Sequence, residues 1–435
     1  MRSSISMLVT VLGLAALPSW AADWTRFRGP NGSGLAPDAD VPATWSDTQN
    51  LQWKTALPGR GSSSPIVCGE CVFVTSYSGY GDGSTDGSLD KLRRHLLCLE
   101  RQTGKILWDK TVAAELPEDP YAGYLIEHGY ASSTPVTDGE RVYAFFGKTG
   151  VLAFDFTGRQ LWQVNVGKQS SNRRWGSGAS PLLYKNMVIV NAAEESRSLR
   201  ALDTLTGKEV WQAASDRLEL CFSTPALVDG GGGRTDLVVA VPDELWAFNP
   251  DTGKLRWFAQ TGIGGNVSPS VVASDGVLFA TGGFPQTGTV AVRGGGKGDV
   301  TRTNVLWSSE VASYVPSPVV QGGHLYFVSD RGVATCLDVK SGQVVYKEAL
   351  PGITSTGRGG KPVYASTLLA GKHLYAVTRR KGTFVLNAAP QFAVVAQNSF
   401  TGDDSDFNAT PAISGNQIFL RSNRFIYCVK IGAGG

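Results

Sequence analysis

The sequence predicts an all-β fold, an eight-bladed β-propeller built from four-stranded antiparallel blades. Three observations predict it. A short strand that carries Trp recurs five times, four times after a Thr-Gly turn, and SGQVVY at 341–346 is a sixth copy with Tyr. A Ser or Thr before Pro opens most units, typically 44 to 49 residues after the previous one. Between these landmarks lie short β-forming runs and polar turns, without sustained helical periodicity.

Composition narrows the function classes. The chain has 435 residues, and its 53 Gly and 21 Pro supply the turns that such a fold needs. Charged residues make up 18% of the chain and the net charge is +3, so bulk electrostatics give no support to a nucleic-acid partner, and none is expected. With four His and three Met, no His-rich metal centre or Met-lined groove is expected.

The first 21 residues are typical of a signal peptide. Arg2 gives the positive start, an apolar stretch follows at 7–17, and Ser19 and Ala21 are the small residues that a signal peptidase reads. The stretch is too short for a stable membrane span, no Cys follows the cleavage site, and no later apolar run approaches the length of a span. We expect cleavage after Ala21 and a periplasmic or secreted protein without a membrane anchor.

Eight landmark positions define the blades. They are Ser64-Pro65, Thr134-Pro135, Ser180-Pro181, Thr224-Pro225, Ser268-Pro269, Ser317-Pro318, Ser366-Thr367 (which lacks the Pro) and Thr410-Pro411. After each landmark the pattern predicts three strands, and the third ends in a small residue, an apolar residue and often Asp. The Thr-Gly turn and the fourth strand follow.

The last unit stops after its third strand, at 426–430, and its missing fourth strand is at the other end of the chain. Residues 50–57 have the fourth-strand pattern, with Trp53 in the Trp position. Because an unclosed ring would expose two blade edges, we predict that this strand completes the last blade. The predicted domains are a signal peptide (1–21), an N-terminal extension (22–49), one propeller (50–431) and a tail (432–435).

The repeat assigns structural roles to most Trp and Cys residues. We expect the fourth-strand Trp residues to pack between blades, since each buries a large apolar area. They are Trp53, Trp108, Trp162, Trp211, Trp257 and Trp307. Cys98, Cys336 and Cys428 occupy a third-strand position that elsewhere holds Ala. Cys68 and Cys71 flank a two-residue turn, where a local disulfide or two free thiols are expected in preference to a metal.

The unit A-x-D-x-x-T-G-K-x-x-W resembles the repeat of pyrroloquinoline-quinone-type propellers. Its cleanest copy runs from Ala201 to Trp211, and the next from Ala247 to Trp257. The opening at 24–30, WTRFRGP, is similar to that of secreted bacterial quinoprotein-like proteins. The resemblance implies either a quinone- and calcium-dependent alcohol or sugar dehydrogenase, or a cofactor-free scaffold such as the propeller lipoprotein of the outer-membrane β-barrel assembly machine. The repeat itself arises from blade packing and does not choose between them.

The sequence departs from the dehydrogenases of that superfamily. It has no adjacent Cys pair and no Cys-x-x-Cys-His for an attached haem, and no calcium ligands can be carried over. The insertion at 78–95 spaces oxygen ligands from Asp82 to Asp90 like a calcium loop, but Arg93 stands where a bidentate carboxylate is needed, which favours a flexible polar lid. No cofactor is expected, and pyrroloquinoline quinone with calcium remains the alternative.

Candidate binding residues precede the first strands, because the segments that lead into the innermost strands of a propeller line one mouth of its channel. Arg side chains together with Trp and Tyr could hold a planar anion by bidentate bonds and stacking. The candidates are Arg60, His128, Tyr130, Arg173, Arg174, Trp175, Glu219, Asn266, Tyr314, Arg358, Asp406 and Asn408. Without a ligand, the same residues would be polar loop ends that solvate the channel.

From these observations we expect a monomeric, non-catalytic binding or interaction scaffold that uses the channel-mouth face. Its partner would be a protein or a small anionic or sugar-like ligand. The alternatives are a pyrroloquinoline quinone- and calcium-dependent oxidoreductase, and a module that recognises polysaccharide or peptide. A lone His at the mouth without a nucleophile beside it does not support a Ser–His–Asp hydrolase.

Overall fold

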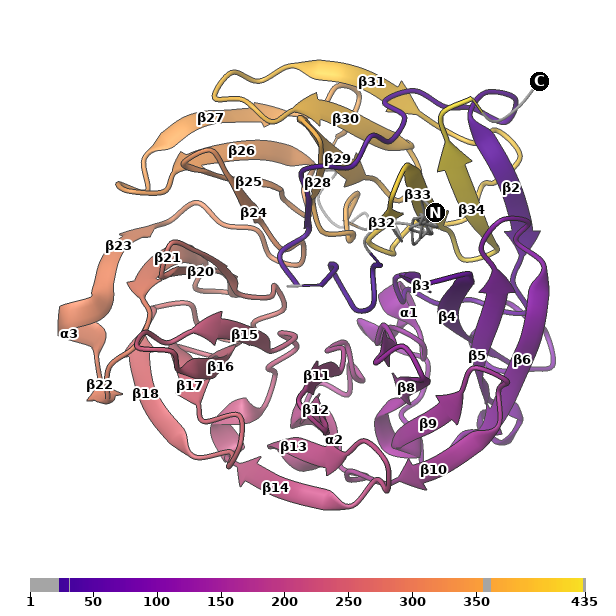
Figure 1. The fold of residues 1–435 in the computed structure, drawn as a ribbon, viewed down its shortest axis with the longest axis horizontal. Coiled ribbons are helices and arrows are strands. Elements are labelled where there is room, and N and C mark those ends of the chain that lie inside the picture. Colours follow the sequence, from indigo (N-terminus) through magenta and orange to yellow (C-terminus); the bar gives the residue numbers. More distant parts are fainter. Residues whose placement is uncertain (1–22, 31, 355–360, 433–435) are drawn as a thin grey trace, which may run out of the picture.

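Eight sheets stand around a central channel in the computed structural model, which describes residues 23–30, 32–354 and 361–432 (Figure 1). The predicted eight-bladed propeller of four-stranded antiparallel blades is confirmed. In each blade the first strand lies nearest the channel and the fourth at the rim. The signal peptide predicted at 1–21 and most of the predicted tail lie outside the described residues. No helix in the described ranges has the length and apolarity to cross a membrane.

The first four blades follow one another along the chain. Blade one comprises β3 (Ile66–Cys68), β4 (Cys71–Ser78), β5 (Arg93–Glu100) and β6 (Ile106–Ala113). Blade two comprises β7 (Val136–Thr137), β8 (Arg141–Phe145), β9 (Val151–Asp155) and β10 (Gln160–Val164). Blade three comprises β11 (Leu182–Tyr184), β12 (Met187–Ala192), β13 (Ser198–Asp203) and β14 (Glu209–Ala214). Blade four comprises β15 (Ala226–Asp229), β16 (Thr235–Val241), β17 (Glu244–Phe248) and β18 (Leu255–Gln260).

The other four blades continue the ring. Blade five comprises β19 (Val272–Ser274), β20 (Val277–Gly282), β21 (Gly288–Arg293) and β23 (Val305–Ser309). Blade six comprises β24 (Val319–Gln321), β25 (His324–Val328), β26 (Val333–Asp338) and β27 (Val344–Ala349). Blade seven comprises β28 (Leu368–Ala370), β29 (His373–Val377), β30 (Thr383–Asn387) and β31 (Val394–Asn398). Blade eight comprises β32 (Ala412–Ser414), β33 (Gln417–Arg421), β34 (Phe425–Lys430) and β2 (Leu51–Ala56).

The ring closes as predicted, because β2 pairs antiparallel with β34 and Trp53 lies opposite Cys428. Two blades carry a fifth strand that the repeat does not encode. β1 (Leu35–Ala36) runs parallel to β28, and β22 (Gly298–Asp299) runs parallel to β18. Short helices lie in the connections: α1 (Leu125–His128), α2 (Ala193–Ser196), α3 (Thr301–Asn304), η1 (Leu89–Lys91), η2 (Gly147–Thr149) and η3 (Asp216–Leu218).

Five of the six fourth-strand Trp residues join neighbouring blades through an indole hydrogen bond. The indole of Trp211 donates to the carbonyl of Pro250 in the next blade, at 2.9 Å. Its ring covers Gly253 of that blade's Thr-Gly turn so closely that a Cβ there would lie 2.5 Å from it. Trp53, Trp108, Trp162 and Trp307 repeat both contacts. The recurring Thr-Gly and the recurring Trp are therefore the two halves of one interblade contact.

The small residue of the third strand is explained by the same Trp. Trp211 lies directly opposite Ala201, and Trp108 directly opposite Cys98. A larger side chain at this position would collide with the indole across the strand pair. Trp257 departs from the pattern, because its indole donates to the buried Asp236 carboxylate of its own blade, at 2.8 Å.

The Ser and Thr landmarks form hydrogen bonds around the channel. The Thr134 hydroxyl accepts from the backbone N–H of Ser64 in the preceding blade, at 2.9 Å. The same bond runs from the backbone N–H of one landmark to the hydroxyl of the next in four further pairs: Thr134 to Ser180, Ser180 to Thr224, Ser317 to Ser366, and Ser366 to Thr410. In blade five the equivalent residue is Ser270, which donates to Ser317, so the Ser268-Pro269 landmark stands two residues before the structural position.

The N-terminal extension crosses the ring (Figure 1). Trp24 bridges to Val67 of blade one, and the carbonyl of Thr25 accepts from blade two. Arg26 donates to Pro225 of blade four and Arg28 to Pro318 of blade six. The segment then pairs with blade seven through β1. Burial lowers the pKa of Arg26 to about 10 and that of Arg28 to about 9. The WTRFRGP opening thus contacts four blades, and together with β1 it forms a strap that ties five blades together across the channel.

Cys68 and Cys71 face each other across the predicted hairpin. Both are free thiols in the structure, the second of the two alternatives that the sequence left open. Cys98, Cys336 and Cys428 are buried in third strands, as the repeat predicted.

Candidate binding site at the channel mouth

A funnel opens at the mouth formed by the loops that enter the first strands. It has a volume of about 160 Å³, and Phe27 of the N-terminal strap lines it. Its wall is the ring of landmark hydroxyls, and its rim is aromatic: Tyr124, Trp175, Phe222, Tyr314 and Tyr364. The Trp175 ring lies 4.5 Å from that of Tyr124 and 5.9 Å from that of Phe222. The landmark hydroxyls therefore serve both the interblade bonds and the channel surface.

The connection at 114–133, between blades one and two, reaches over this mouth and carries α1. Glu127 on α1 forms an ion pair with Arg379 of blade seven at 2.5 Å, and its carbonyl accepts from Asn408. His128 is half-buried, and desolvation lowers its pKa, which favours the neutral ring. Its Nε2 then donates to the carbonyl of Trp175 at 2.9 Å. These bonds hold α1 against blades that are remote in sequence.

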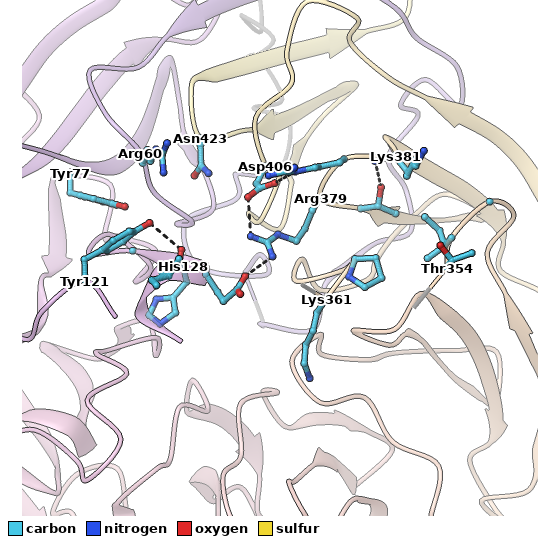
Figure 2. Close-up of a pocket in the computed structure, with 18 residues that line it drawn as sticks. Arg60, Tyr77, Tyr121, His128, Thr354, Lys361, Arg379, Lys381, Asp406 and Asn423 are labelled. Atoms are coloured by element: carbon cyan, nitrogen blue, oxygen red, sulfur yellow. Dashed lines mark hydrogen bonds and ion pairs between the residues drawn. The ribbon is translucent and has the colours of Figure 1, made fainter. Parts of the chain in front are cut away.

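A wider cleft of about 560 Å³ lies next to the funnel, and Figure 2 shows the residues that line it. His128 lines both the cleft and the funnel. Its charged lining residues are Arg60, Glu127, Lys361, Arg379, Arg380, Lys381 and Asp406. Asp406 forms ion pairs with Arg379 at 2.9 Å and with Arg380 at 2.6 Å. Lys361 pairs with Asp330 at 2.6 Å and lies over the Tyr314 ring. Basic side chains therefore outnumber acidic ones in this cleft by five to two.

The insertion of blade one lies beside this cleft. It occupies 79–92 between β4 and β5, and a Cβ on Gly83 would lie 2.9 Å from the Arg60 guanidinium. The Asp82 carboxylate accepts bonds from Gly79 and Ser84 of its own loop. In the described ranges no cluster of three or more His, Cys, Asp or Glu residues could hold a metal ion.

The structure brings part of the predicted set together. His128, Trp175, Tyr314 and Asn408 line the funnel, and Arg60 and Asp406 line the cleft. Arg173 places its guanidinium 5.8 Å from the Trp175 ring. These residues come from loops of different blades, so only ring closure makes them neighbours.

Other predicted residues lie elsewhere. Tyr130 is buried and donates to the carbonyl of Asp119, and Asn266 is buried and donates to the Tyr314 hydroxyl. Glu219 pairs with Arg197 at 2.8 Å and shares a separate surface depression with Arg174. Arg358 lies outside the described residues.

Sequence reasoning missed several residues of the site. Arg379, Arg380 and Lys381 lie between the second and third strands of blade seven, a class of loop that reaches the same mouth. The run RRKG after the second strand was the available signal. Phe27 was missed because nothing in the repeat indicates that the extension enters the channel.

A buried acidic cluster lies beneath the 114–133 connection, outside both pockets. Glu194 and Glu195 stand on α2, and one carboxylate oxygen of each has no hydrogen-bond partner within the described chain. Burial raises the pKa of Glu194 to about 7 and that of Glu195 to about 8. The same small cavity is lined by two ion pairs, Arg94 with Glu118 and Lys148 with Asp119.

Comparison with protein families gives a match over more than half of the chain. The model of the family described as outer membrane protein assembly factor BamB matches residues 92–348. BamB of Salmonella typhimurium is 24% identical over 263 residues, which span 48% of this chain and 65% of that protein. A polyvinylalcohol dehydrogenase from Pseudomonas sp. is 22% identical over 292 residues, 55% of this chain and 40% of that enzyme. The matches thus span less than two thirds of these relatives.

Solved structures share the fold. BamB from Moraxella catarrhalis superposes with a TM-score of 0.61 at 14% identity, covering 88% of this chain and 98% of that one. A quinohemoprotein alcohol dehydrogenase from Pseudomonas putida also gives a TM-score of 0.61, at 12% identity, covering 95% of this chain and 81% of that enzyme. At these identities the similarity establishes the propeller architecture alone.

Proposed function

The chain belongs to the family described as outer membrane protein assembly factor BamB, and from this premise we propose that it is a non-catalytic interaction scaffold. It binds a protein partner through the channel-mouth face, as a monomer, in the periplasm or after secretion. The predicted signal peptide with cleavage near Ala21 is the basis for this location. The name of the family supports a role in assembly, and the mouth face supplies the surface.

The observation that carries the proposal is the pair of large apolar side chains exposed at the mouth. Phe284, in the loop between β20 and β21, is 59% exposed and packs its ring edge-on against Tyr314 of the funnel rim. Ile126 on α1 is 50% exposed and lines the basic cleft. Burying the exposed half of each side chain against a partner is favourable by roughly 1 kcal/mol. Exposed apolar patches that are rimmed by polar residues mark interaction sites, and here both side chains adjoin the funnel or the charged cleft.

The test is a pair of matched double variants. Ile126→Asp with Phe284→Asp places two charges on the mouth face, and Val210→Asp with Leu306→Asp places two on exposed apolar positions of fourth strands. Affinity-tagged chains are recovered from cross-linked periplasm, and the bound partner is measured by mass spectrometry. We expect the mouth variant to lose the partner and the strand variant to keep it. Loss from the strand variant alone would contradict the proposal.

A quinone-dependent oxidoreductase is the second candidate, favoured by the match to polyvinylalcohol dehydrogenase. The residues at the mouth do not fit a quinone held with calcium. Calcium takes roughly six to eight oxygen ligands, whereas the cleft carboxylates Glu127 and Asp406 are both bound by Arg379. The Trp175 ring already contacts Tyr124 and Phe222. Saturable binding of pyrroloquinoline quinone with calcium, together with alcohol-dependent dye reduction, would favour the enzyme over the scaffold.

A module that recognises polysaccharide or peptide is the third candidate, and among the predicted binding residues Arg174 and Trp175 would have to form its ligand site together. Arg174 lines a depression separate from the funnel that holds Trp175, so the two do not form one ligand site. If a glycan protects Trp175 fluorescence from quenching and no protein partner is recovered, the result would favour polysaccharide recognition.

A further inference from the structure

We propose that the partner presents an acidic segment that carries an aromatic or large aliphatic side chain. Its carboxylates bind in the basic cleft and its apolar side chain enters the funnel. This inference rests on the proposed function and specifies the chemistry of the partner at the same face. The two pockets meet at His128, so one short stretch of chain can reach both.

The cleft has more positive charge than its own carboxylates neutralise. Its two carboxylates are already neutralised, since Arg379 lies between Glu127 and Asp406 and Arg380 also pairs with Asp406. Arg60 and Lys381 have no acidic partner at ion-pair distance in the described part of the chain. The cleft therefore carries a surplus of positive charge that its own residues leave uncompensated. An incoming carboxylate would gain charge-assisted hydrogen bonds without breaking an existing pair.

The chemistry of the funnel suits an apolar side chain. Its wall hydroxyls, such as Thr134 and Ser180, already accept backbone N–H bonds from the preceding blade. The rest of the lining is largely aromatic, and both ring nitrogens of His128 are already hydrogen-bonded. Among the buried polar atoms of the lining, the hydroxyls of Ser64 and Tyr364 and the Oδ1 of Asn408 lack a hydrogen-bond partner in the described part of the chain, which is few for the many hydroxyls of a sugar. The pocket of about 160 Å³ suits one apolar side chain.

The exposed position of Phe284 favours a protein segment over a small anion as the ligand. A small ligand within the cleft and funnel would leave Phe284, which belongs to neither lining, exposed beside them. A folded or extended protein that inserts one segment would cover it. A polynucleotide would need a longer row of cations, whereas the cationic side chains gather here in a single cleft and the net charge is only +3.

The experiment uses the full mature chain and a fluorescein-labelled peptide in which Asp and Glu flank a single Phe. Two matched peptides carry Asn and Gln in place of the acids, or Ser in place of Phe, and a single-stranded oligonucleotide represents other polyanions. The cleft variant is Arg60→Glu with Lys381→Glu. Its control, Lys208→Glu with Lys254→Glu, makes the same charge change in exposed Thr-Gly turns. Binding is measured by fluorescence anisotropy at low and high salt.

We expect the acidic Phe peptide to bind the natural chain and the control variant alike. Each matched peptide, and the cleft variant, should bind at least about tenfold more weakly, and salt should weaken the acidic peptide further. Equal binding of the Asn/Gln peptide, stronger binding of the oligonucleotide, or full affinity in the cleft variant would overturn the inference. If any of these occurs while the Ile126→Asp, Phe284→Asp variant still loses its partner, the proposed acidic segment is wrong but the proposed scaffold function is kept. If that variant also keeps its partner, both fail.

Discussion

Single buried residues beneath the 114–133 connection show how the fold sets their chemistry. Glu195 is 2% exposed and has a Ser177 hydroxyl on one carboxylate oxygen and no partner within the described chain on the other. Burial without a countercharge favours its protonated form. Its pKa, raised from 4.5 to about 8, makes folding sensitive to pH at a position that supports the 114–133 connection.

The sign of this effect follows from the direction of the shift. Below about pH 4.5 the carboxyl is protonated in both states, and between about pH 4.5 and pH 8 only the unfolded chain ionises, so stability falls through this window. Glu195→Gln keeps an acceptor for Ser177 but cannot ionise. We expect it to raise the melting temperature near pH 8 and to leave it nearly unchanged near pH 4.5.

The control variant, Glu219→Gln, should change the melting temperature in the opposite direction. The pKa of Glu219 is lowered by the backbone N–H of Asn172 and by Arg197. Glu219→Gln should therefore lower the melting temperature near neutral pH, by a modest amount because the pair is partly exposed. A Glu195→Gln protein whose melting temperature falls in parallel with that of the natural chain as pH rises would contradict the assignment.

At the scale of elements, the turn of one blade and the fourth strand of its neighbour form a repeated contact. The Gly253 turn has φ +67°, and its missing Cβ leaves the space that the Trp211 ring fills. Because the Trp, the opposite small residue and the Gly all recur in sequence, this contact could be predicted in outline. Which blade receives each Trp could not, since the repeat does not state the handedness of the ring.

Gly253→Ala tests the contact against a matched glycine. Gly262 has φ +69° and nothing within 4 Å of its Cβ position, so Gly262→Ala carries the backbone strain without the clash. We expect Gly253→Ala to destabilise the chain by about 1–3 kcal/mol more than Gly262→Ala, as overpacking in a close-packed core does. Urea denaturation followed by Trp fluorescence measures the difference. Equal midpoints would show that the Trp-to-Gly contact adds nothing beyond backbone strain.

The sequence predicts most elements of the ring but not the elements that close its channel. The eight blades, their four strands and the closing strand β2 all carry repeated landmarks. The strap at 24–36, the fifth strands β1 and β22, and helix α1 occur once, so no internal comparison could place them. In blade five the sequence landmark is two residues away from the structural position, since Ser270 and not Ser268 makes the interblade hydrogen bond.

For the site, the rule that residues before the first strands line a mouth placed six of its twelve candidates in the lining of the funnel or the cleft. It found His128, Trp175, Tyr314 and Asn408 in the funnel. It missed Arg379, because second-to-third-strand loops reach the same mouth, and it overvalued Tyr130 and Glu219, which turn into local hydrogen bonds and ion pairs. Side-chain direction within a loop depends on tertiary partners that a single sequence does not show.

For the molecule as a whole, the ring is closed by β2 and tied across by the strap, which leaves its surface loops as the adaptable part. The loops at the mouth gather uncompensated cations, an aromatic funnel and exposed apolar side chains from several blades. The fourth strands at the rim offer a different surface, with exposed Leu and Val residues in most blades. We propose that the partner binds at the channel mouth and not at the outer fourth strands.

Hydrogen–deuterium exchange of the chain with and without its cross-linked partner tests this claim most directly. We expect slower exchange in the connection at 114–133, in the loop at 378–382 and around Phe284, with the outer strands β14, β23 and β27 unchanged. Protection confined to those outer strands, with the mouth loops exchanging as in the free chain, would contradict it.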